Sequence, residues 1–196
     1  MHILIDCDGV LADFSGHLLR LVGSELTVED ITEWDIFKFM TPSQLECAKM
    51  LLAGPEFWAS QPQIPGAAEG VEELRSGDHT ITVVTSPWYG CEVWGHVRRE
   101  WLKRNFAVDA ADVVVAARKE RLQGEVFIDD KTENGEAWAA ANPAGLAALY
   151  AQPYNRGDGR RSRRLPQLTR GRWHAGPGVH RIGDLVGAFQ DSRVAR

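Results

Sequence analysis

The stretch I-L-I-D-C-D-G, at Ile3–Gly9, is a short apolar run that ends in two acids one residue apart. An apolar run of this length predicts a buried β-strand, here over His2–Ile5. Asp6 and Asp8 would then stand at the carboxyl end of this strand, where Gly9 permits a tight turn of the backbone. The start of the chain therefore predicts a strand whose end carries two carboxylates.

Three later segments repeat this arrangement of an apolar strand followed by polar side chains. They are V-V-T-S at Val83–Ser86, A-R-K at Ala117–Lys119 and F-I-D-D at Phe127–Asp130. Each one alone has an ordinary explanation, because an Asp or Thr after a strand is commonly a turn residue or a helix cap, and a single Lys is commonly a solvated surface residue. The combination of all four is more specific, and it favours a shared functional site.

Strands and helices alternate along most of the chain. Further strands are expected at β-branched or aromatic runs, and helices where apolar residues recur with helical spacing. These segments are Thr80–Thr85, Val113–Val115, Val126–Ile128 and Leu146–Tyr150 for the strands, and Val10–Val22, Ala67–Leu74 and Glu92–Leu102 for the helices. The alternation predicts an α/β protein with a Rossmann-like parallel sheet flanked by helices.

A long insertion interrupts this alternation after the first helix begins. Residues 15–61 are rich in Trp and Phe and include a helix-like stretch at Ser43–Leu52. The sequence Q-P-Q-I-P-G, at Gln61–Gly66, is turn-rich and typical of a boundary. We therefore expect a core domain of residues 1–14 and 62–196, with residues 15–61 forming a small helical cap inserted after the first strand.

A second irregular stretch, Asn155–Gly178, is rich in Arg and Gly and poor in apolar residues. A long loop is expected there. Its run R-R-S-R-R, at Arg160–Arg164, is either a solvated part of this loop or a grip for a second phosphate or a nucleic acid. The solvated loop is the favoured interpretation.

Composition excludes several classes of protein. The chain has 196 residues, is 44% hydrophobic and carries a net charge of −5, so no overall positive field favours nucleic acid, which is an unlikely partner. We see no secretory signal and no apolar run of membrane-spanning length. The three scattered cysteines, Cys7, Cys47 and Cys91, fit a reducing compartment, and we expect a cytoplasmic protein.

The acids predict a metal site. Ligands of an open parallel sheet bind beyond the carboxyl ends of its strands, so Asp6, Asp8 and the pair Asp129-Asp130 would meet at one edge. Carboxylates gathered in this way repel each other unless a cation lies between them. Mg²⁺ is the expected cofactor because it prefers oxygen ligands and also binds substrate phosphates. An EF-hand is excluded, since its twelfth position requires Glu and here holds His17.

The remaining polar groups predict phosphate chemistry at the same edge. Thr85, with Ser86 beside it, offers a hydroxyl to a phosphate oxygen, and Lys119 offers a positive charge. A carboxylate can attack phosphorus and form an aspartyl-phosphate. The four segments together therefore predict a phosphoryl-transfer site.

At these residues the chain resembles the haloacid-dehalogenase (HAD) superfamily of phosphatases, and within it the 5'(3')-deoxyribonucleotidases. The segments that carry the resemblance are D-C-D-G-V-L-A-D-F at Asp6–Phe14, E-F-W-x-x-x-x-x-I-P-G-A at Glu56–Ala67, T-S-P at Thr85–Pro87, I-D-D-K at Ile128–Lys131 and Q-P-Y-N-R at Gln152–Arg156. The resemblance covers most of the chain. It implies an Mg²⁺-dependent phosphatase that hydrolyses deoxyribonucleoside monophosphates.

The resemblance also implies roles for single residues. Asp6 would be the nucleophile and Asp8 the general acid and base. Asp6, the Asp8 carbonyl and one of the pair Asp129-Asp130 would hold the metal, with Asp130 favoured. Thr85, Ser86 and Lys119 would bind phosphate, and Phe14, Trp34, Asp35 and Ile36 would lie by the base and sugar.

Three hypotheses follow. The first is a deoxyribonucleotidase, in which one or two of the cap aromatics Phe14, Trp34, Phe37 and Trp58 stack on a base while the others form the cap core. The second is a HAD phosphatase of another small phosphomonoester, such as a sugar phosphate. The third is a phosphate- or nucleic-acid-binding module on an inactive scaffold, which the complete set of acids argues against. A small soluble substrate is the expected partner, and a homodimer is a possible assembly.

Overall fold

The computed structural model describes residues 1–160, 168–174 and 180–194. Within these residues, seven parallel strands form one sheet in the order β3-β2-β1-β4-β5-β6-β7. The strands are β1 (His2–Asp6), β2 (Thr80–Thr85), β3 (Val113–Val115), β4 (Val126–Asp129), β5 (Leu146–Tyr150), β6 (Leu168–Arg172) and β7 (His180–Arg181). The α/β class, the parallel sheet and the five strands expected from the sequence are confirmed.

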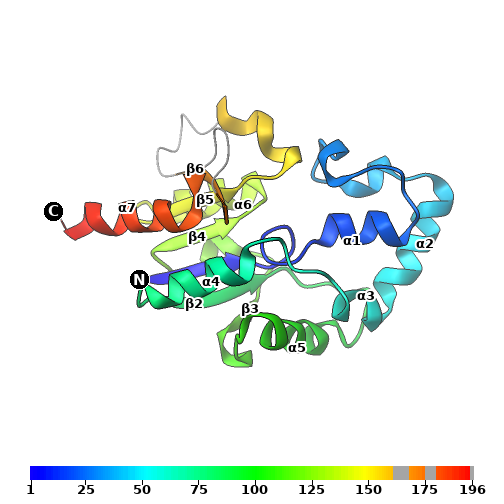
Figure 1. Cartoon of the computed structure of the whole chain (residues 1–196), viewed down its shortest axis with the longest axis horizontal. Helices are drawn as coiled ribbons and strands as arrows, with labels where there is room; N and C mark the ends of the chain where they lie inside the picture. Colours follow the sequence, from blue (N-terminus) through cyan, green and yellow to red (C-terminus); the bar gives the residue numbers. More distant parts are fainter. Residues whose placement is uncertain (161–167, 175–179, 195–196) are drawn as a thin grey trace.

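Helices cover both faces of the sheet (Figure 1). The alternation of β1 sends Ile3 and Ile5 into a core shared with α4 (Ala67–Ser76), α5 (Trp94–Phe106) and α7 (Ile182–Val194). Leu4 points to the opposite face, where it packs with Trp138 of α6 (Thr132–Ala141). The central strand is therefore buried on both faces, as a continuous apolar run predicts.

The first helix begins later than the sequence pattern suggested. A helix was expected over Val10–Val22, but α1 spans Phe14–Leu21. The backbone first turns tightly at Gly9, which has a φ of +82°. Asp13 then caps the helix, with its Oδ1 accepting a hydrogen bond from Gly16 N at 2.9 Å. Apolar spacing marks the buried face, while the turn and cap determine where the helix begins.

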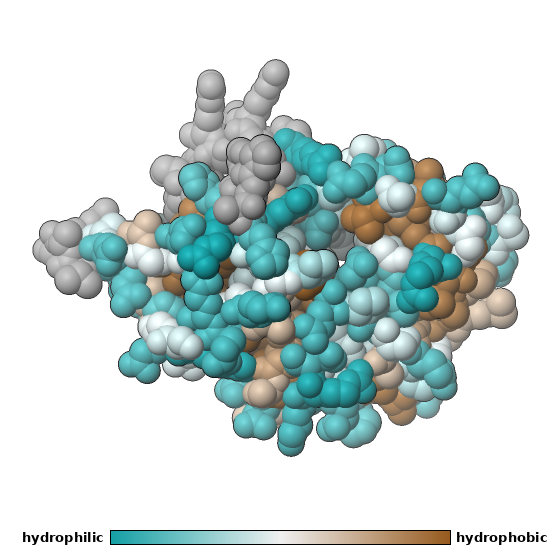
Figure 2. Space-filling view, in the orientation of Figure 1, coloured by the Kyte–Doolittle hydropathy of each residue, from teal (hydrophilic) through white to brown (hydrophobic). Residues whose placement is uncertain are grey.

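The inserted segment packs around apolar side chains of its own. It contains η1 (Val28–Asp30), η2 (Ile36–Phe39), α2 (Pro42–Ala53) and α3 (Pro55–Ala59) after α1. The apolar core of this segment also includes Cys91 and Trp94, which lie beyond the boundary expected at residue 61. The segment lies at the end of the molecule opposite α7 in Figure 1, and hydrophobic atoms gather over it at the right of Figure 2. That residues 15–61 form a separate cap domain stays a prediction.

Within the described residues, the Arg- and Gly-rich stretch forms regular secondary structure instead of the expected long loop. Residues Leu168–Arg172 form β6, which pairs with β5, and the chain leaves β5 through η5 (Pro153–Arg160). The sequence analysis missed β6 because the segment lacks an apolar run, and its place depends on the free edge of β5. Trp173, next to this strand, is buried and donates from its indole nitrogen to Val10 O at 2.8 Å. Residues 161–167 and 175–179, with most of the R-R-S-R-R run, lie outside the described residues.

Two short helices complete the path between the strands, η3 (Ala110–Asp112) before β3 and η4 (Lys119–Arg121) after it. The second places Lys119 where β3 has ended. No helix in the described ranges is long and apolar enough to cross a membrane.

Candidate active site

The acidic residues meet at the carboxyl ends of the two central strands. Asp6 is the last residue of β1 and Asp129 the last of β4, and these strands are neighbours. The chain goes to one side of β1 for β2 and β3 and returns to the other side for β4, which makes this the switch point of the sheet. In Figure 1, β1 runs from the N-terminus toward the inserted segment, so the acids face that segment.

Lys119 lies between the acids of the two strands. Its Nζ is 2.7 Å from Asp6 Oδ1 and 2.7 Å from Asp129 Oδ2. Asp129 also accepts hydrogen bonds from the backbone N–H of Lys131 at 2.8 Å and from Asn134 Nδ2. Burial alone would lower the pKa of Lys119, but the two carboxylates outweigh it and raise the pKa, so this lysine is charged.

One lysine does not balance three buried acids. Burial raises the pKa of Asp6 well above its ordinary value, and the charges of Asp129 and Asp130 add to this effect while Lys119 opposes it. Burial and the charge of Asp129 likewise raise the pKa of Asp130 to about 7. The cluster therefore has excess negative charge, which a bound cation would neutralise.

The geometry of these acids fits a divalent cation. Asp6, Asp129 and Asp130 each offer one oxygen, and the three oxygens lie within 4.8 Å of one another. All three residues are buried. Carboxylate oxygens are the ligands that hard cations such as Mg²⁺ prefer. The cluster is therefore a candidate metal centre.

Asp8 lies apart from this cluster and has a different partner. Arg98 Nη2, from α5, is 2.8 Å from Asp8 Oδ1 and 2.9 Å from Oδ2. Gln61 Nε2 donates to the same Oδ1 at 3.3 Å, and its own Oε1 accepts from Arg98 Nη1 at 2.8 Å. Neither partner was predicted from the sequence, because a buried Arg on a helix and a Gln in a turn carry no local signal of function.

The expected phosphate-binding residues occupy the same edge of the sheet. Val84 pairs with Asp6 across β1 and β2, so Thr85 follows one residue beyond the level of Asp6. Thr85 is buried and Ser86 is exposed. With Lys119 in contact with Asp6, these residues border the acids, and their phosphate-binding roles stay a prediction.

The segment Q-P-Y-N-R contacts the acidic cluster directly. The Tyr154 hydroxyl donates to Asp130 Oδ2, and Asn155 Nδ2 donates to Asp130 O at 2.8 Å. Gln152 Nε2 donates to Gly9 O at 2.6 Å. These three side chains had no assigned role in the sequence analysis, although the motif itself was noted. They connect the segment after β5 to the loop that follows β1 and to the loop that follows β4.

The Gly9→Ala variant is expected to lose more free energy of unfolding than backbone strain alone would cost. At the positive φ of Gly9, a Cβ would lie 2.8 Å from Asp130 Cγ and 3.0 Å from the Tyr154 hydroxyl oxygen. The matched control is Gly23→Ala, at a φ of +65° with no atom within 4 Å of the added Cβ. Strain of this kind costs about 1–3 kcal/mol at either site. Urea denaturation should show a larger loss for Gly9→Ala, whereas equal losses would mean that Asp130 and Tyr154 move aside freely.

The residues expected to lie by the base and sugar have structural contacts. Phe14 packs against the rings of Phe57 and Trp58. Asp35 Oδ1 accepts from Phe37 N at 3.2 Å, and Ile36 is buried in the core of the inserted segment. Their contact with substrate stays a prediction.

Trp34 differs from these residues because 56% of its surface is exposed. The Lys131 Nζ, just after the acidic pair, is 3.7 Å from the centre of its ring. This cation–π contact brings the inserted segment next to the acidic loop.

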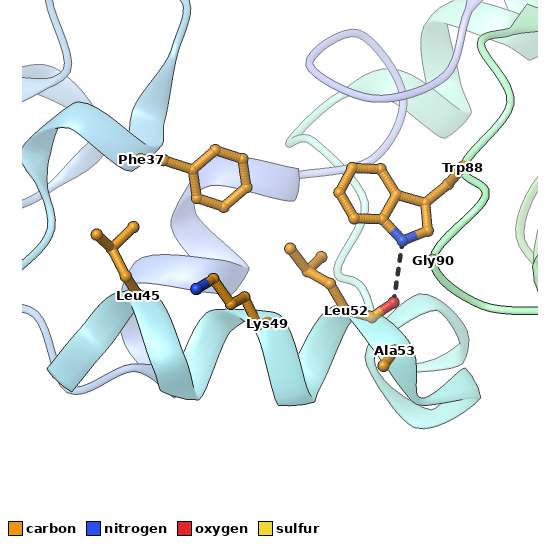
Figure 3. A pocket seen from close by; sticks show the side chains of 7 residues that line it. All are labelled: Phe37, Leu45, Lys49, Leu52, Ala53, Trp88 and Gly90. Carbon is orange, nitrogen blue, oxygen red and sulfur yellow. Dashed lines mark hydrogen bonds between the residues drawn. The ribbon is translucent and has the colours of Figure 1, made fainter. Parts of the chain in front are cut away.

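A cavity of ≈ 440 Å³ lies between α2, Phe37 and the segment that follows β2 (Figure 3). It is lined by Phe37, Leu45, Lys49, Leu52, Ala53, Trp88 and Gly90. Figure 3 shows Phe37 and Trp88 above α2, from which the aliphatic side chains project. Trp88 is held by a hydrogen bond from its Nε1 to Leu52 O at 3.1 Å. An aromatic and aliphatic cavity thus begins three residues after Thr85.

Solved structures define the class of protein to which this fold belongs. A HAD-family hydrolase from Deinococcus radiodurans R1, crystallised with bound phosphate and sodium, matches with a TM-score of 0.57. The match covers 97% of this chain and 95% of that chain at 16% sequence identity. The fold is therefore that of the HAD hydrolases.

Sequence comparison defines the family. The family model described as "5' nucleotidase, deoxy (Pyrimidine), cytosolic type C protein" matches residues 1–163, and the chain belongs to this family. A protein of Bordetella pertussis provisionally named 5'(3')-deoxyribonucleotidase is 28% identical over 163 residues, which cover 80% of this chain and 86% of the relative. The mitochondrial 5'(3')-deoxyribonucleotidase of Homo sapiens is 26% identical over 144 residues, which cover 68% and 63%. The resemblance inferred from the motifs is confirmed.

Proposed function

We propose that this phosphatase of the 5'-nucleotidase family hydrolyses deoxyribonucleoside monophosphates through an aspartyl-phosphate on Asp6. The observation that carries the proposal is the contact of Lys119 with both Asp6 and Asp129, beside Asp130. This contact supports the proposal because it brings the ammonium group of Lys119 together with Asp6, the proposed nucleophile, and two further acids. The names of the relatives support the choice of substrate.

In the first step, an Asp6 carboxylate oxygen attacks phosphorus. The bond from phosphorus to the leaving nucleoside oxygen breaks, and its electron pair goes to that oxygen. Asp8 donates a proton to the same oxygen, which leaves as a nucleoside hydroxyl. Lys119, in contact with Asp6, would bind the phosphoryl oxygens as negative charge gathers on them.

In the second step, water hydrolyses the aspartyl-phosphate. Asp8, now ionised, takes a proton from the attacking water. The bond between phosphorus and the Asp6 oxygen breaks, which releases inorganic phosphate and restores the Asp6 carboxylate. Asp8 is then protonated again and ready for the next substrate.

Asp6 and Asp130 would hold Mg²⁺, together with the Asp8 carbonyl. We favour Asp130 over Asp129 because both Asp129 oxygens already accept hydrogen bonds, from Lys119, Lys131 N and Asn134, whereas Asp130 accepts the Tyr154 hydroxyl at Oδ2. The bound ion would supply positive charge to the phosphoryl oxygens. Burial, and after it the charges of the neighbouring acids, raise the pKa values of Asp6 and Asp130, and a bound cation would offset both effects, which supports this assignment.

The surroundings of the site favour a small substrate with an apolar group. Thr85 and Ser86 would bind the phosphate, and the cavity beside Phe37 and Trp88 offers aromatic rings for a base. The inserted segment beside the acids supports a small molecule as partner rather than a polymer. A cytoplasmic location and a homodimer stay predictions.

A panel of phosphomonoesters, assayed with Mg²⁺ and with a chelator, tests the proposal. We expect turnover only with Mg²⁺, and a higher kcat/KM for a deoxyribonucleotide than for the matching ribonucleotide. Strong turnover of sugar phosphates, with indifference to the base, would support the alternative phosphatase. Salt-sensitive DNA binding without any turnover would contradict both.

A further inference from the structure

Helix α5 carries a buried arginine, Arg98, next to the proposed proton donor Asp8. Arg98 has no exposed surface and lies among the rings of Trp58, Trp94 and Trp101, with its guanidinium carbon 5.3, 5.9 and 5.7 Å from their centres. Its Nε has no hydrogen-bond partner in the part of the chain that the structure describes. A buried charge is costly unless it is paired, so the pairing of Arg98 requires an explanation.

Arg98 is paired with Asp8 and with Gln61, which also donates a hydrogen bond to Asp8. Arg98 Nη2 contacts both Asp8 oxygens, and Nη1 donates to Gln61 Oε1. Gln61 Nε2 closes the ring by donating to Asp8 Oδ1. Gln61 is itself fixed, because its carbonyl accepts from Trp101 Nε1 at 2.9 Å and its side chain is buried. Arg98 thus holds Asp8 through Nη2 and holds Gln61, the second donor to Asp8, through Nη1.

The hydrogen bonds distinguish the two Asp8 oxygens. Among the described residues, Oδ1 accepts from both Arg98 and Gln61, while Oδ2 accepts from Arg98 alone. A carboxylate oxygen has about two acceptor positions, so Oδ2 retains one. The Asp8 side chain is 31% exposed although Arg98 is fully buried. Asp8 is therefore held from its buried side and open on the other.

We propose that Arg98 and Gln61 are positioning residues that aim Asp8 Oδ2 at the leaving oxygen of the substrate. This inference rests on the proposed function, in which Asp8 donates the proton. Loss of Arg98 would leave the Asp8 carboxylate free to rotate, and loss of Gln61 would remove one of the two hydrogen bonds to Oδ1, so proton donation would slow in both cases. Departure of an alkoxide leaving group depends on that proton, whereas 4-nitrophenolate is a stable anion and depends on it much less.

The test compares two leaving groups in the full-length protein with Mg²⁺. We expect Arg98→Met to lower kcat/KM for a deoxyribonucleotide about 100-fold, with a loss at least tenfold smaller for 4-nitrophenyl phosphate. The kcat/KM value is the right quantity because it covers the steps up to departure of the leaving group. Arg98→Lys, which keeps a charge beside Asp8, should recover part of the nucleotide activity.

The matched control is Arg104→Met on the same helix. Arg104 Nη2 donates to Ala59 O at 2.6 Å, so this variant removes a link between α5 and the inserted segment without touching Asp8. Arg104→Met should lower kcat/KM only slightly, and by the same factor for both substrates. If Arg98→Met does not fold, Gln61→Leu gives the same comparison, with an expected tenfold selective loss for the nucleotide.

If Arg98→Met or Gln61→Leu lowers kcat/KM equally for the two substrates, or for neither, the positioning role is overturned. Failure of the proposed function is a separate outcome. Wild-type protein that hydrolyses sugar phosphates but no nucleotide would contradict the nucleotidase proposal, and the comparison would then use that sugar phosphate as the alkyl ester.

Discussion

Replacement of Asp6 by Asn is expected to reduce turnover by a factor on the order of 10⁴ or more, because the amide cannot form the aspartyl-phosphate. The fold should tolerate the change. Burial and the charges of Asp129 and Asp130 already make the ionised form of Asp6 unfavourable, and Asn has nearly the same shape. The melting temperature in chelator should stay within about 5 °C of the wild type.

Steady-state assays and rapid acid quench followed by mass spectrometry measure this effect. The wild type should carry phosphate on Asp6 during turnover, and the variant should carry none. The matched control is Asp109→Asn, an exposed aspartate whose side chain makes no capping hydrogen bond. Near-normal turnover by Asp6→Asn would rule out this residue as the nucleophile.

Replacement of Lys119 by Met is expected to cost both stability and activity. The variant leaves the buried carboxylates of Asp6 and Asp129 without their shared cation. Removal of one partner from a buried ion pair lowers the free energy of unfolding by about 3–5 kcal/mol. The kcat value should fall about 100- to 1,000-fold, since the positive charge proposed to stabilise the phosphoryl oxygens is lost.

The pH dependence of this loss separates charge from packing. Lys119 opposes the rise in the Asp6 pKa, so its removal should raise that pKa further. A carboxyl group whose pKa is raised on folding adds stability below its unfolded pKa, and this contribution is lost as pH rises through the folded pKa. Lys119→Met should therefore be destabilised more at about pH 8 than at about pH 5, relative to wild type.

Urea denaturation in chelator at the two pH values measures this difference. Lys103→Met, an exposed lysine on α5, is the control and should be nearly neutral at both. A destabilisation of Lys119→Met that does not change with pH would mean that lost packing, rather than unbalanced charge, is responsible.

Most of the acids proposed for catalysis could be predicted from the sequence because their positions follow from local rules. Apolar runs predict strands, and strands joined by helices run parallel, so residues that follow the strands share an edge. Asp6 and Asp129 obey this rule directly, as last residues of β1 and β4. Lys119 was found in the same way, although it lies beyond the end of β3 on a short helix.

Other parts had no local signal. The strand β6 has no apolar run, and it exists because β5 offers an edge for pairing. Arg98 lies within an ordinary amphipathic helix, and only the packing of α5 against Gln61 and Trp58 brings it to Asp8. The segment Q-P-Y-N-R was visible as a motif, but its hydrogen bonds to Gly9 and Asp130 were not.

The amino-acid sequence by itself therefore determined the α/β class, the family and the acids of the site, since these depend on periodicity and on short motifs. Tertiary structure alone decided the partners of those acids: Lys119 for Asp6 and Asp129, Arg98 for Asp8, and Tyr154 for Asp130. The physical reason is that the strength of a charge interaction depends on distance and burial. Both arise only when segments far apart in the chain pack together.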